Sequence, residues 1–490
     1  MPPRIMAPAD KNVIRITSLW LRRFDLRKLP TSLGNSRSAA RLVIRCTLRA
    51  YRAMVCQTGA VNALTRIIAG ALAAIFPVAP YAQPAQAPTA IDQFARLQGE
   101  LRRTHESGDS TGYLSTAQSM YSFLNGSPRG TLQLMSAQSF AGKTDEALHS
   151  FSQFVAMGQA NEEVLKAKSF DPLRGLPGYQ DIYASMAANA ASKSTASEVF
   201  RLGHTALVPE DIDYDPESKH FYISTVLGKQ ILQLDMAGHA KLFASGPDRW
   251  PLMALKVDSR RRLLWATEVA LDGFAAAAKQ DWGRSAILQY DLRSGRLLHR
   301  IEGPPKAALG DMALAVNGDP IVSDGEHGGV YRVSGSALRV RRIDAGDFVS
   351  PQTPAALPDG THLLVPDYVR GLGMLDLNTK HVDWIPMAGT HALSGIDGLY
   401  AVGNLLIATQ NGTSPERVMQ FTLGGSNTRI VAESIIERAT SSLGDPTHGV
   451  VVGSYFYYIA NSGWDVLDDH GNLLEGKSLP VGSVRRAKII

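Results

Sequence analysis

After Phe200 the apolar and polar residues alternate with a period of two, which is the pattern of half-buried β-strands. One plan then recurs six times: a short strand, a turn on Asp, Gly or Asn, and further strands. The openings of the six segments are 42, 59, 41, 45 and 48 residues apart, and the long interval contains an insertion at 275–278. Four short strands need about 40 residues, so this spacing predicts a mainly β fold, a six-bladed β-propeller rather than one of five or seven blades. The openings are Glu210, Leu252, Asp311, Gln352, Asp397 and Asp445.

Between residues 92 and 191 the apolar positions follow a helical period instead. Gly142, Ala147 and Phe151 have the small, small, large spacing of two closely packed helices joined by a turn. The segment resembles a degenerate tetratricopeptide repeat, and the resemblance implies a surface for a protein partner. Because such repeats need about three units to bury a common core, a helical cap packed against the propeller is an equal alternative.

The N-terminal part of the chain has the pattern of a secretory signal. Residues 67–78 form an apolar run that is too short to span a bilayer, Arg66 precedes it, and small residues follow it up to Ala82 and Ala87. We therefore expect residues 1–53 to be a non-native leader, 54–87 a signal peptide, 88–197 a helical region and 198–490 the propeller. The expected location is periplasmic or secreted, without a stable membrane anchor.

Charge and cysteine content narrow the classes of function. The chain has a formal net charge of +5, but residues 1–53 carry twelve Lys or Arg against two Asp, so the remainder beyond the signal is mildly acidic. Such a body has no electrostatic reason to bind nucleic acid. The only cysteines, Cys46 and Cys56, precede the expected cleavage site, which excludes disulfides and thiolate chemistry from the mature protein.

In a propeller the first strand of each blade lines the central channel, so the segment openings are expected to converge on one axis. In this chain, several carboxylates and one amide would meet at the axis. Carboxylates that face one channel repel each other, and a bound divalent cation relieves this repulsion. Oxygen ligands of this kind suit calcium or magnesium. The alternative is that some of the acids cap turns at the channel mouth. The convergent set is Glu210, Asp311, Gln352, Asp397 and Asp445, with Asp211 beside Glu210.

Two of these openings also resemble those of a known family. The run 209–215 (PEDIDYD) is similar to the first-blade opening of the gluconolactonase, senescence-marker-protein and luciferin-regenerating-enzyme family, whose Glu binds the metal, and the Glu210-Asp211 pair is similar to the paraoxonases. The run 395–399 (GIDGL) resembles the Asp-Gly opening whose Asp is a metal ligand and general base. Gln352 stands where the family has an Asn ligand, and Asp311 follows Gly310 where the family has Asn-Asp.

The resemblance implies an exported, metal-dependent hydrolase of a lactone or related ester. Its metal, by expectation calcium, would be held by Glu210, Asp311, Gln352 and Asp397, with Asp397 as the catalytic base and Asp211 and Asp445 as further channel residues. The alternative is a non-catalytic propeller that binds a small molecule at its channel, or a protein through the helical region. Since propellers serve many functions, the ligand set must decide between the two.

Overall fold

The structure, a computed structural model, describes residues 88–203, 207–274, 277–387, 391–425 and 427–489. The expected leader and signal peptide lie outside these residues. No helix in the described part is long and apolar enough to cross a membrane. The helical region consists of α4 (Ala90–Glu106), α5 (Ser110–Phe123), α6 (Pro128–Phe140), α7 (Thr144–Ala156), α8 (Glu162–Leu165), the 3₁₀-helix η2 (Lys168–Leu173) and α9 (Tyr179–Asn189).

Local sequence signals explain where these helices begin and end. Thr89 and Asp92 form a capping box that starts α4. Gly142 adopts a φ of 74° between α6 and α7, a left-handed conformation that glycine reaches without strain. Ala147 and Phe151 of α7 are fully buried, so the predicted helix-turn-helix packing is present.

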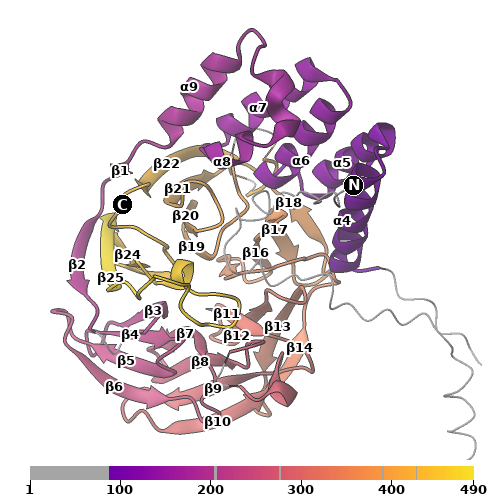
Figure 1. The fold of residues 1–490 in the computed structure, drawn as a ribbon. Helices are drawn as coiled ribbons and strands as arrows, with labels where there is room; N and C mark the ends of the chain where they lie inside the picture. Colours follow the sequence, from indigo (N-terminus) through magenta and orange to yellow (C-terminus); the bar gives the residue numbers. More distant parts are fainter. Residues whose placement is uncertain (1–87, 204–206, 275–276, 388–390, 426, 490) are drawn as a thin grey trace, which may run out of the picture. The chain divides into compact units, whose positions relative to one another are not determined.

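Six antiparallel sheets follow and form the blades of the propeller (Figure 1). The six-bladed prediction is therefore confirmed, and each predicted opening lies at or just before the first strand of a blade. Blades 1 to 3 contain β3 (Pro209–Asp215), β4 (His220–Thr225), β5 (Gln230–Leu234) and β6 (Ala240–Ser245); β7 (Leu252–Asp258), β8 (Leu263–Val269), β9 (Ser285–Asp291) and β10 (Leu297–Glu302); and β11 (Leu309–Leu314), β12 (Pro320–Asp324), β13 (Gly329–Ser334) and β14 (Arg339–Arg342).

Blades 4 to 6 show how the ring is closed. Blade 6 takes its outermost strand, β2, from the N-terminal side of the propeller, where it pairs with the last strand, β25. This pairing covers an edge that would otherwise be exposed. The strands are β15 (Ala355–Ala356), β16 (His362–Asp367), β17 (Gly371–Asp376) and β18 (Val382–Trp384); β19 (Gly398–Val402), β20 (Leu405–Gln410), β21 (Arg417–Leu423) and β22 (Ile430–Arg438), extended by β1 (Lys193–Ser194); and β23 (Gly449–Val452), β24 (Tyr455–Ala460), β25 (Ser483–Lys488) and β2 (Ser197–Arg201). Short 3₁₀-helices, η3 (Lys279–Asp281) and η4 (Trp464–Val466), lie in the loops of blades 2 and 6.

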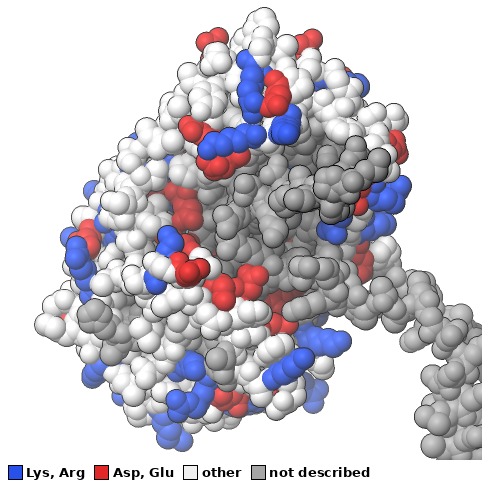
Figure 2. All heavy atoms as spheres, in the orientation of Figure 1, with Lys and Arg blue, Asp and Glu red and all other residues white. Residues whose placement is uncertain are grey.

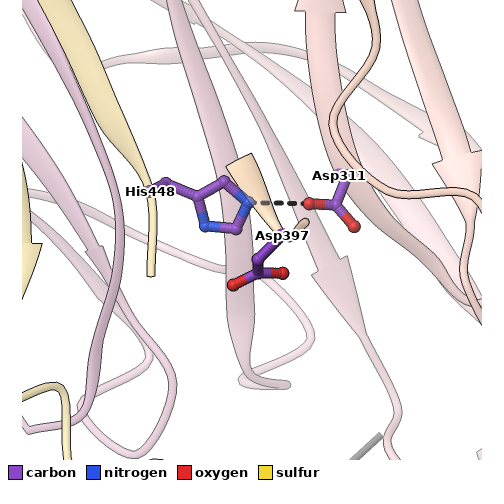
Figure 3. A group of neighbouring side chains, drawn as sticks. All are labelled: Asp311, Asp397 and His448. Carbon is purple, nitrogen blue, oxygen red and sulfur yellow. Dashed lines mark hydrogen bonds and ion pairs between the residues drawn. The ribbon is translucent and has the colours of Figure 1, made fainter. Parts of the chain in front are cut away.

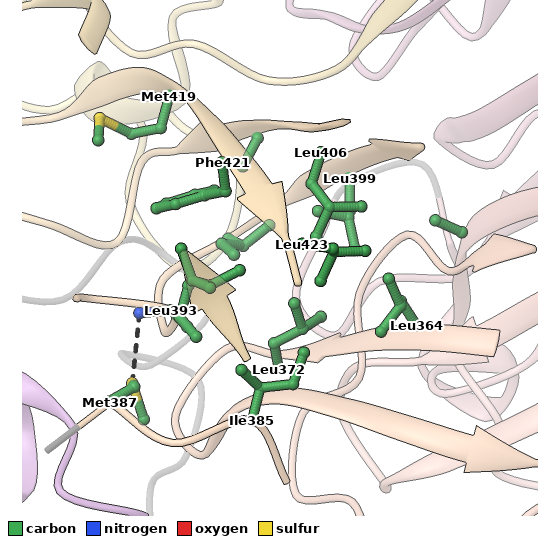
Figure 4. Packing of buried hydrophobic residues seen from close by; sticks show 14 of the residues in the cluster. Leu364, Leu372, Ile385, Met387, Leu393, Leu399, Leu406, Met419, Phe421 and Leu423 are labelled. Carbon is green, nitrogen blue, oxygen red and sulfur yellow. Dashed lines mark hydrogen bonds between the residues drawn. The ribbon is translucent and has the colours of Figure 1, made fainter. Parts of the chain in front are cut away.

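The core of the propeller is a set of apolar clusters, one between each pair of neighbouring blades. Figure 4 shows the cluster between blades 4 and 5, where Leu364 and Leu372 pack against Leu399, Leu406 and Phe421. Each blade buries both faces, and this burial provides the main driving force for closing the ring.

The helical region packs on loops of blades 4 and 5. Val349 and Val369 belong to the same apolar cluster as α4 and α5. The guanidinium of Arg370 lies 4.4 Å from the ring centroid of Phe123 in α5 and 4.2 Å from that of Trp384 in blade 4. Asn125 donates a hydrogen bond of 2.9 Å to the carbonyl oxygen of Arg370. The helices therefore cover apolar propeller surface, as a helical cap would.

Candidate functional site

Three buried side chains from different blades meet near the start of the inner strands (Figure 3). Asp311 lies on β11, whereas Asp397 and His448 immediately precede β19 and β23. Their ligand atoms all lie within 4.8 Å of one another, and the residues are only 2%, 3% and 1% exposed. We call them the Asp311–Asp397–His448 group; within the described part of the chain this group could hold a metal ion.

Irregularities in the strand register help to aim the side chains. The pairing of β11 with β12 shifts between Leu309 and Asp311, and that of β3 with β4 shifts between Pro209 and Ile212, the segment that contains Glu210. A bulge turns a side chain out of the regular alternation of a strand. These shifts explain how acidic residues come to lie at the channel end of strands that are otherwise regular.

His448 connects two blades through both ring nitrogens. Nε2 lies 2.7 Å from Oδ1 of Asp311, and Nδ1 lies 3.0 Å from the carbonyl oxygen of Glu210. Since a carbonyl oxygen can only accept, Nδ1 carries a proton. Burial lowers the pKa of His448, but the charges of Asp397 and Asp311 and the hydrogen bond to Asp311 outweigh it and raise that pKa well above its ordinary value. The imidazolium form therefore compensates the carboxylates.

Asp397 is held by a side chain from the next turn of its own blade. Nδ2 of Asn411 donates to Oδ2 of Asp397 at 2.8 Å and also to the carbonyl oxygen of Pro446 at 3.1 Å. The hydroxyl of Tyr368 donates to Oδ1 of Asn411 at 3.0 Å, which fixes the amide orientation. Burial raises the pKa of Asp397 to about 6, against the opposing effect of His448 and with a further contribution from Asp311.

Asp311 receives a second hydrogen bond from blade 4. Oγ1 of Thr353 donates to Oδ1 of Asp311 at 2.9 Å, and the backbone N–H of Thr353 donates to the carbonyl oxygen of Asp397 at 3.2 Å. Thr353 thus ties blades 3, 4 and 5 together at the site.

Glu210 lies beside the group but directs its carboxylate elsewhere. Its Oε2 accepts a hydrogen bond from the indole Nε1 of Trp464 in η4. Burial raises the pKa of Glu210 to about 8; His448 and Trp464 act against this shift, whereas Asp397 and Asp311 add to it. Its side chain is not one of the three that gather within 4.8 Å.

The other predicted channel residues lie close by in different settings. The amide nitrogen of Gln352 donates to the carbonyl and hydroxyl oxygens of Ser350, both at 3.1 Å, and its buried Oε1 has no hydrogen-bond partner among the described residues. Asp211 forms a buried ion pair of 2.6 Å with Lys256. Asp445 accepts a hydrogen bond of 3.3 Å from the hydroxyl of Ser462, and burial together with Asp465 and Asp397 raises its pKa to about 8.

Sequence reasoning gave no role to three residues that the structure places at the site: His448, Asn411 and Trp464. In the sequence, His448 is an isolated histidine three residues after Asp445, and no motif marks it. Asn411 begins the sequence Asn-Gly-Thr, a pattern of glycosylated surface loops, but its side chain is buried and bonded to Asp397. A better signal for His448 is its position directly before the inner strand β23, equivalent to that of Asp397 before β19.

A cavity of about 220 Å³ continues along the axis from the group and is lined by inner-strand residues of all six blades. Thr353 connects the cavity with the group, because it lines the cavity and its hydroxyl donates a hydrogen bond to Asp311. Inner strands such as β19 and β23 are buried at their N-terminal ends and half-buried at their C-terminal ends, so exposure increases with distance from the group. On the face seen in Figure 1, Asp and Glu side chains gather near the middle (Figure 2).

In comparisons with known proteins, only solved structures are similar to this chain. No family model and no curated protein matches the chain. A gluconolactonase from Xanthomonas campestris is similar at 13% identity and a TM-score of 0.42, over 60% of this chain and 89% of that one. An aldose sugar dehydrogenase from Streptomyces coelicolor, bound to PQQ, has 12% identity and a TM-score of 0.42 over 61% and 99%. A virginiamycin B lyase from Staphylococcus aureus has 13% identity and a TM-score of 0.37 over 61% and 100%.

Proposed function

We propose that this protein is a metal-dependent hydrolase that acts on a lactone or a related ester, with a divalent cation held by Asp311, Asp397 and His448. The observation that supports the proposal is the convergence of these three buried side chains from blades 3, 5 and 6. Two buried carboxylates so close together need a compensating positive charge. Without a metal the imidazolium form of His448 supplies it, and a divalent cation bound through Nε2 would take the place of the Nε2 proton.

Two carboxylates and one imidazole are suitable ligands for a divalent cation, but the imidazole argues against calcium, the metal expected from the sequence. Calcium takes oxygen ligands, whereas an imidazole nitrogen beside two carboxylates suits zinc, iron or manganese. The buried Oε1 of Gln352, which has no hydrogen-bond partner in the part of the chain that the structure describes, is a further oxygen ligand that the sequence places at a strand opening. We therefore propose one of these transition metals in place of calcium.

The residues of the chain itself would handle the proton. A bound divalent cation would supply Lewis acidity toward the carbonyl group of the ester. Asn411 fixes one carboxylate oxygen of Asp397, and no other side chain among the described residues donates to that carboxylate. The second oxygen is therefore the one that would accept the proton of the attacking water.

A ligand-binding propeller without catalysis is the second candidate. It is favoured by the position of Glu210, whose carboxylate is engaged by Trp464 rather than turned into the group. In that case the axial cavity would bind a small molecule and leave it unchanged.

A substrate panel distinguishes the two candidates. The purified protein, supplied with Zn²⁺ or Mn²⁺, would be tested against five- and six-membered lactones and aryl esters. Hydrolysis that is lost in Asp397→Asn and retained in Asp383→Asn, an exposed aspartate of β18, supports the hydrolase. Binding of a lactone without turnover supports the alternative.

Export also belongs to the proposal. The apolar run at 67–78 and the small residues before Gln83 and Pro88 support cleavage at one of these two positions. N-terminal sequencing of the exported protein tests it, and a mature chain that begins before Ala71 would contradict it.

A further inference from the structure

The side chain of Glu210 has one hydrogen-bond partner in the described part of the chain, and that partner is Trp464. The backbone of Glu210 is fixed separately, because its carbonyl oxygen accepts from Nδ1 of His448 at 3.0 Å and from the backbone N–H of His448 at 3.3 Å. The backbone thus anchors Glu210 at the site, while the indole supplies the hydrogen bond that orients its carboxylate.

Trp464 is itself held firmly. Its ring packs in an apolar cluster with Val208, Met253 and Phe274, and its centroid lies 6.1 Å from that of Phe274. The indole therefore presents its N–H from a preorganised position, and the residue is only 7% exposed. A buried donor that would otherwise lose its hydrogen bond holds its acceptor strongly.

The loop that carries Trp464 crosses toward blade 2. Residues 461–482 connect β24 with β25, and His470 and Gly471 of this loop pack against Gly273 and Phe274 of the loop between β8 and β9. A Cβ at Gly273 would collide with the ring of His470, so the two loops approach too closely for any larger residue there. The position of Trp464 is thus fixed by two blades that are not consecutive in sequence.

We propose that Trp464 is a positioning residue that holds the Glu210 carboxylate outside the Asp311–Asp397–His448 group and thereby limits how tightly that group binds a divalent cation. The inference rests on the proposed function. When the indole releases it, Glu210 adds a third carboxylate to the two aspartates and the imidazole. With the Trp464 hydrogen bond in place, the Glu210 carboxylate is not among the ligand atoms that gather within 4.8 Å. Binding of the cation through Glu210 therefore requires this bond to break, and that cost weakens the affinity.

Calorimetric titration of the full-length mature protein with Mn²⁺ tests the inference. Trp464→Phe keeps the aromatic packing and removes the donor, so the affinity should rise by about tenfold, the equivalent of roughly one hydrogen bond. In the Glu210→Ala background the same substitution should change nothing. Trp384→Phe, which alters a tryptophan of blade 4, is the matched control. If Trp464→Phe does not fold, Trp464→Leu removes the donor with another apolar side chain.

A second measurement without metal separates this inference from the proposed function. In excess chelator, the fluorescence emission of Trp464 is obtained by subtracting the spectrum of Trp464→Phe from that of the wild type. The same subtraction in the Glu210→Ala background should give an emission maximum at a different wavelength. An unchanged emission, or an affinity for Mn²⁺ that Trp464→Phe leaves unchanged or lowers, overturns the inference while the cation site stands. If neither the wild type nor Trp464→Phe binds Mn²⁺ or Zn²⁺, the cation site is rejected and the inference falls with it, although an emission shift would still show that Trp464 holds Glu210.

Discussion

His448 lies 2.7 Å from Asp311 through Nε2 and Oδ1, although 137 residues separate the two in sequence. The contact joins blade 6 to blade 3 across the axis of the propeller, so it exists only because the ring is closed. It forms the centre of the site that we interpret as a cation site.

Replacing His448 should remove cation binding. His448→Ala deletes the imidazole donor and the hydrogen bonds to Asp311 and to the carbonyl oxygen of Glu210. We expect the melting temperature of the variant to be insensitive to chelator, whereas that of the wild type falls. His381→Ala, an exposed histidine beside β18, should behave as the wild type. A chelator effect that persists in His448→Ala would exclude the imidazole as a ligand.

Asn411→Ala should weaken the site without unfolding the propeller. The substitution removes the hydrogen bond that Asn411 donates to Asp397 and the one that it accepts from Tyr368, a loss of about 1–3 kcal/mol in the free energy of unfolding for such buried groups. Activity on any lactone substrate should fall with it. Asn404→Ala, at the exposed turn between β19 and β20, is the control, and denaturant unfolding measures both. Equal stability of the two variants would contradict the role assigned to Asn411.

Stability should also depend on pH through a residue outside the site. Burial raises the pKa of Glu268 from 4.5 to about 8, and both a hydrogen bond with Asp248 and the negative charge of Asp248 add to this shift. The folded protein therefore binds more protons than the unfolded chain between these values, and the stability contributed by neutral Glu268 is lost as the pH rises from 4.5 to 8. Glu268→Gln should flatten this decline, whereas Glu475→Gln, an exposed glutamate, should not. Parallel pH profiles of the melting temperature for Glu268→Gln and the wild type would refute the assignment.

Arg370 should fasten the helical region to the propeller. Arg370→Ala removes the contacts with the rings of Phe123 and Trp384 and a hydrogen bond of 3.1 Å to the carbonyl oxygen of Phe123. We expect faster amide exchange in α4 and α5, with exchange in blades 1 and 2 unchanged, because the propeller ring does not depend on this contact. Arg293→Ala, in an exposed turn of blade 2, is the control. Unchanged exchange in the helices would show that the apolar cluster around Val349 and Val369 suffices.

The fold could be predicted because its signals are local and repeated. Alternation with a period of two and turns such as Asn317-Gly318 and Pro358-Asp359-Gly360 recur at blade spacing, so they determine strand number and ring closure without knowledge of distant contacts. The helical turn at Gly142 was equally local.

The site could be predicted only in part. Asp311 and Asp397 were found because they open blades. His448 was missed because the inner strand of blade 6 begins four residues after Asp445, an offset that no periodicity reveals. Trp464 was missed because it lies in a long irregular loop, and its contact with Glu210 depends on how that loop folds back over the axis.

The most direct test of the account is elemental analysis of the purified, mature wild-type protein, with Asp397→Ala and His448→Ala in parallel. The account predicts about one zinc, manganese or iron ion per wild-type chain after loading and desalting, and a melting temperature that falls when a chelator removes it. Because a cation bound only to the folded state stabilises it, the two variants should contain no metal and show no such fall. A wild-type protein that retains no cation and melts at the same temperature with and without chelator would contradict the metal site and with it the proposed hydrolase.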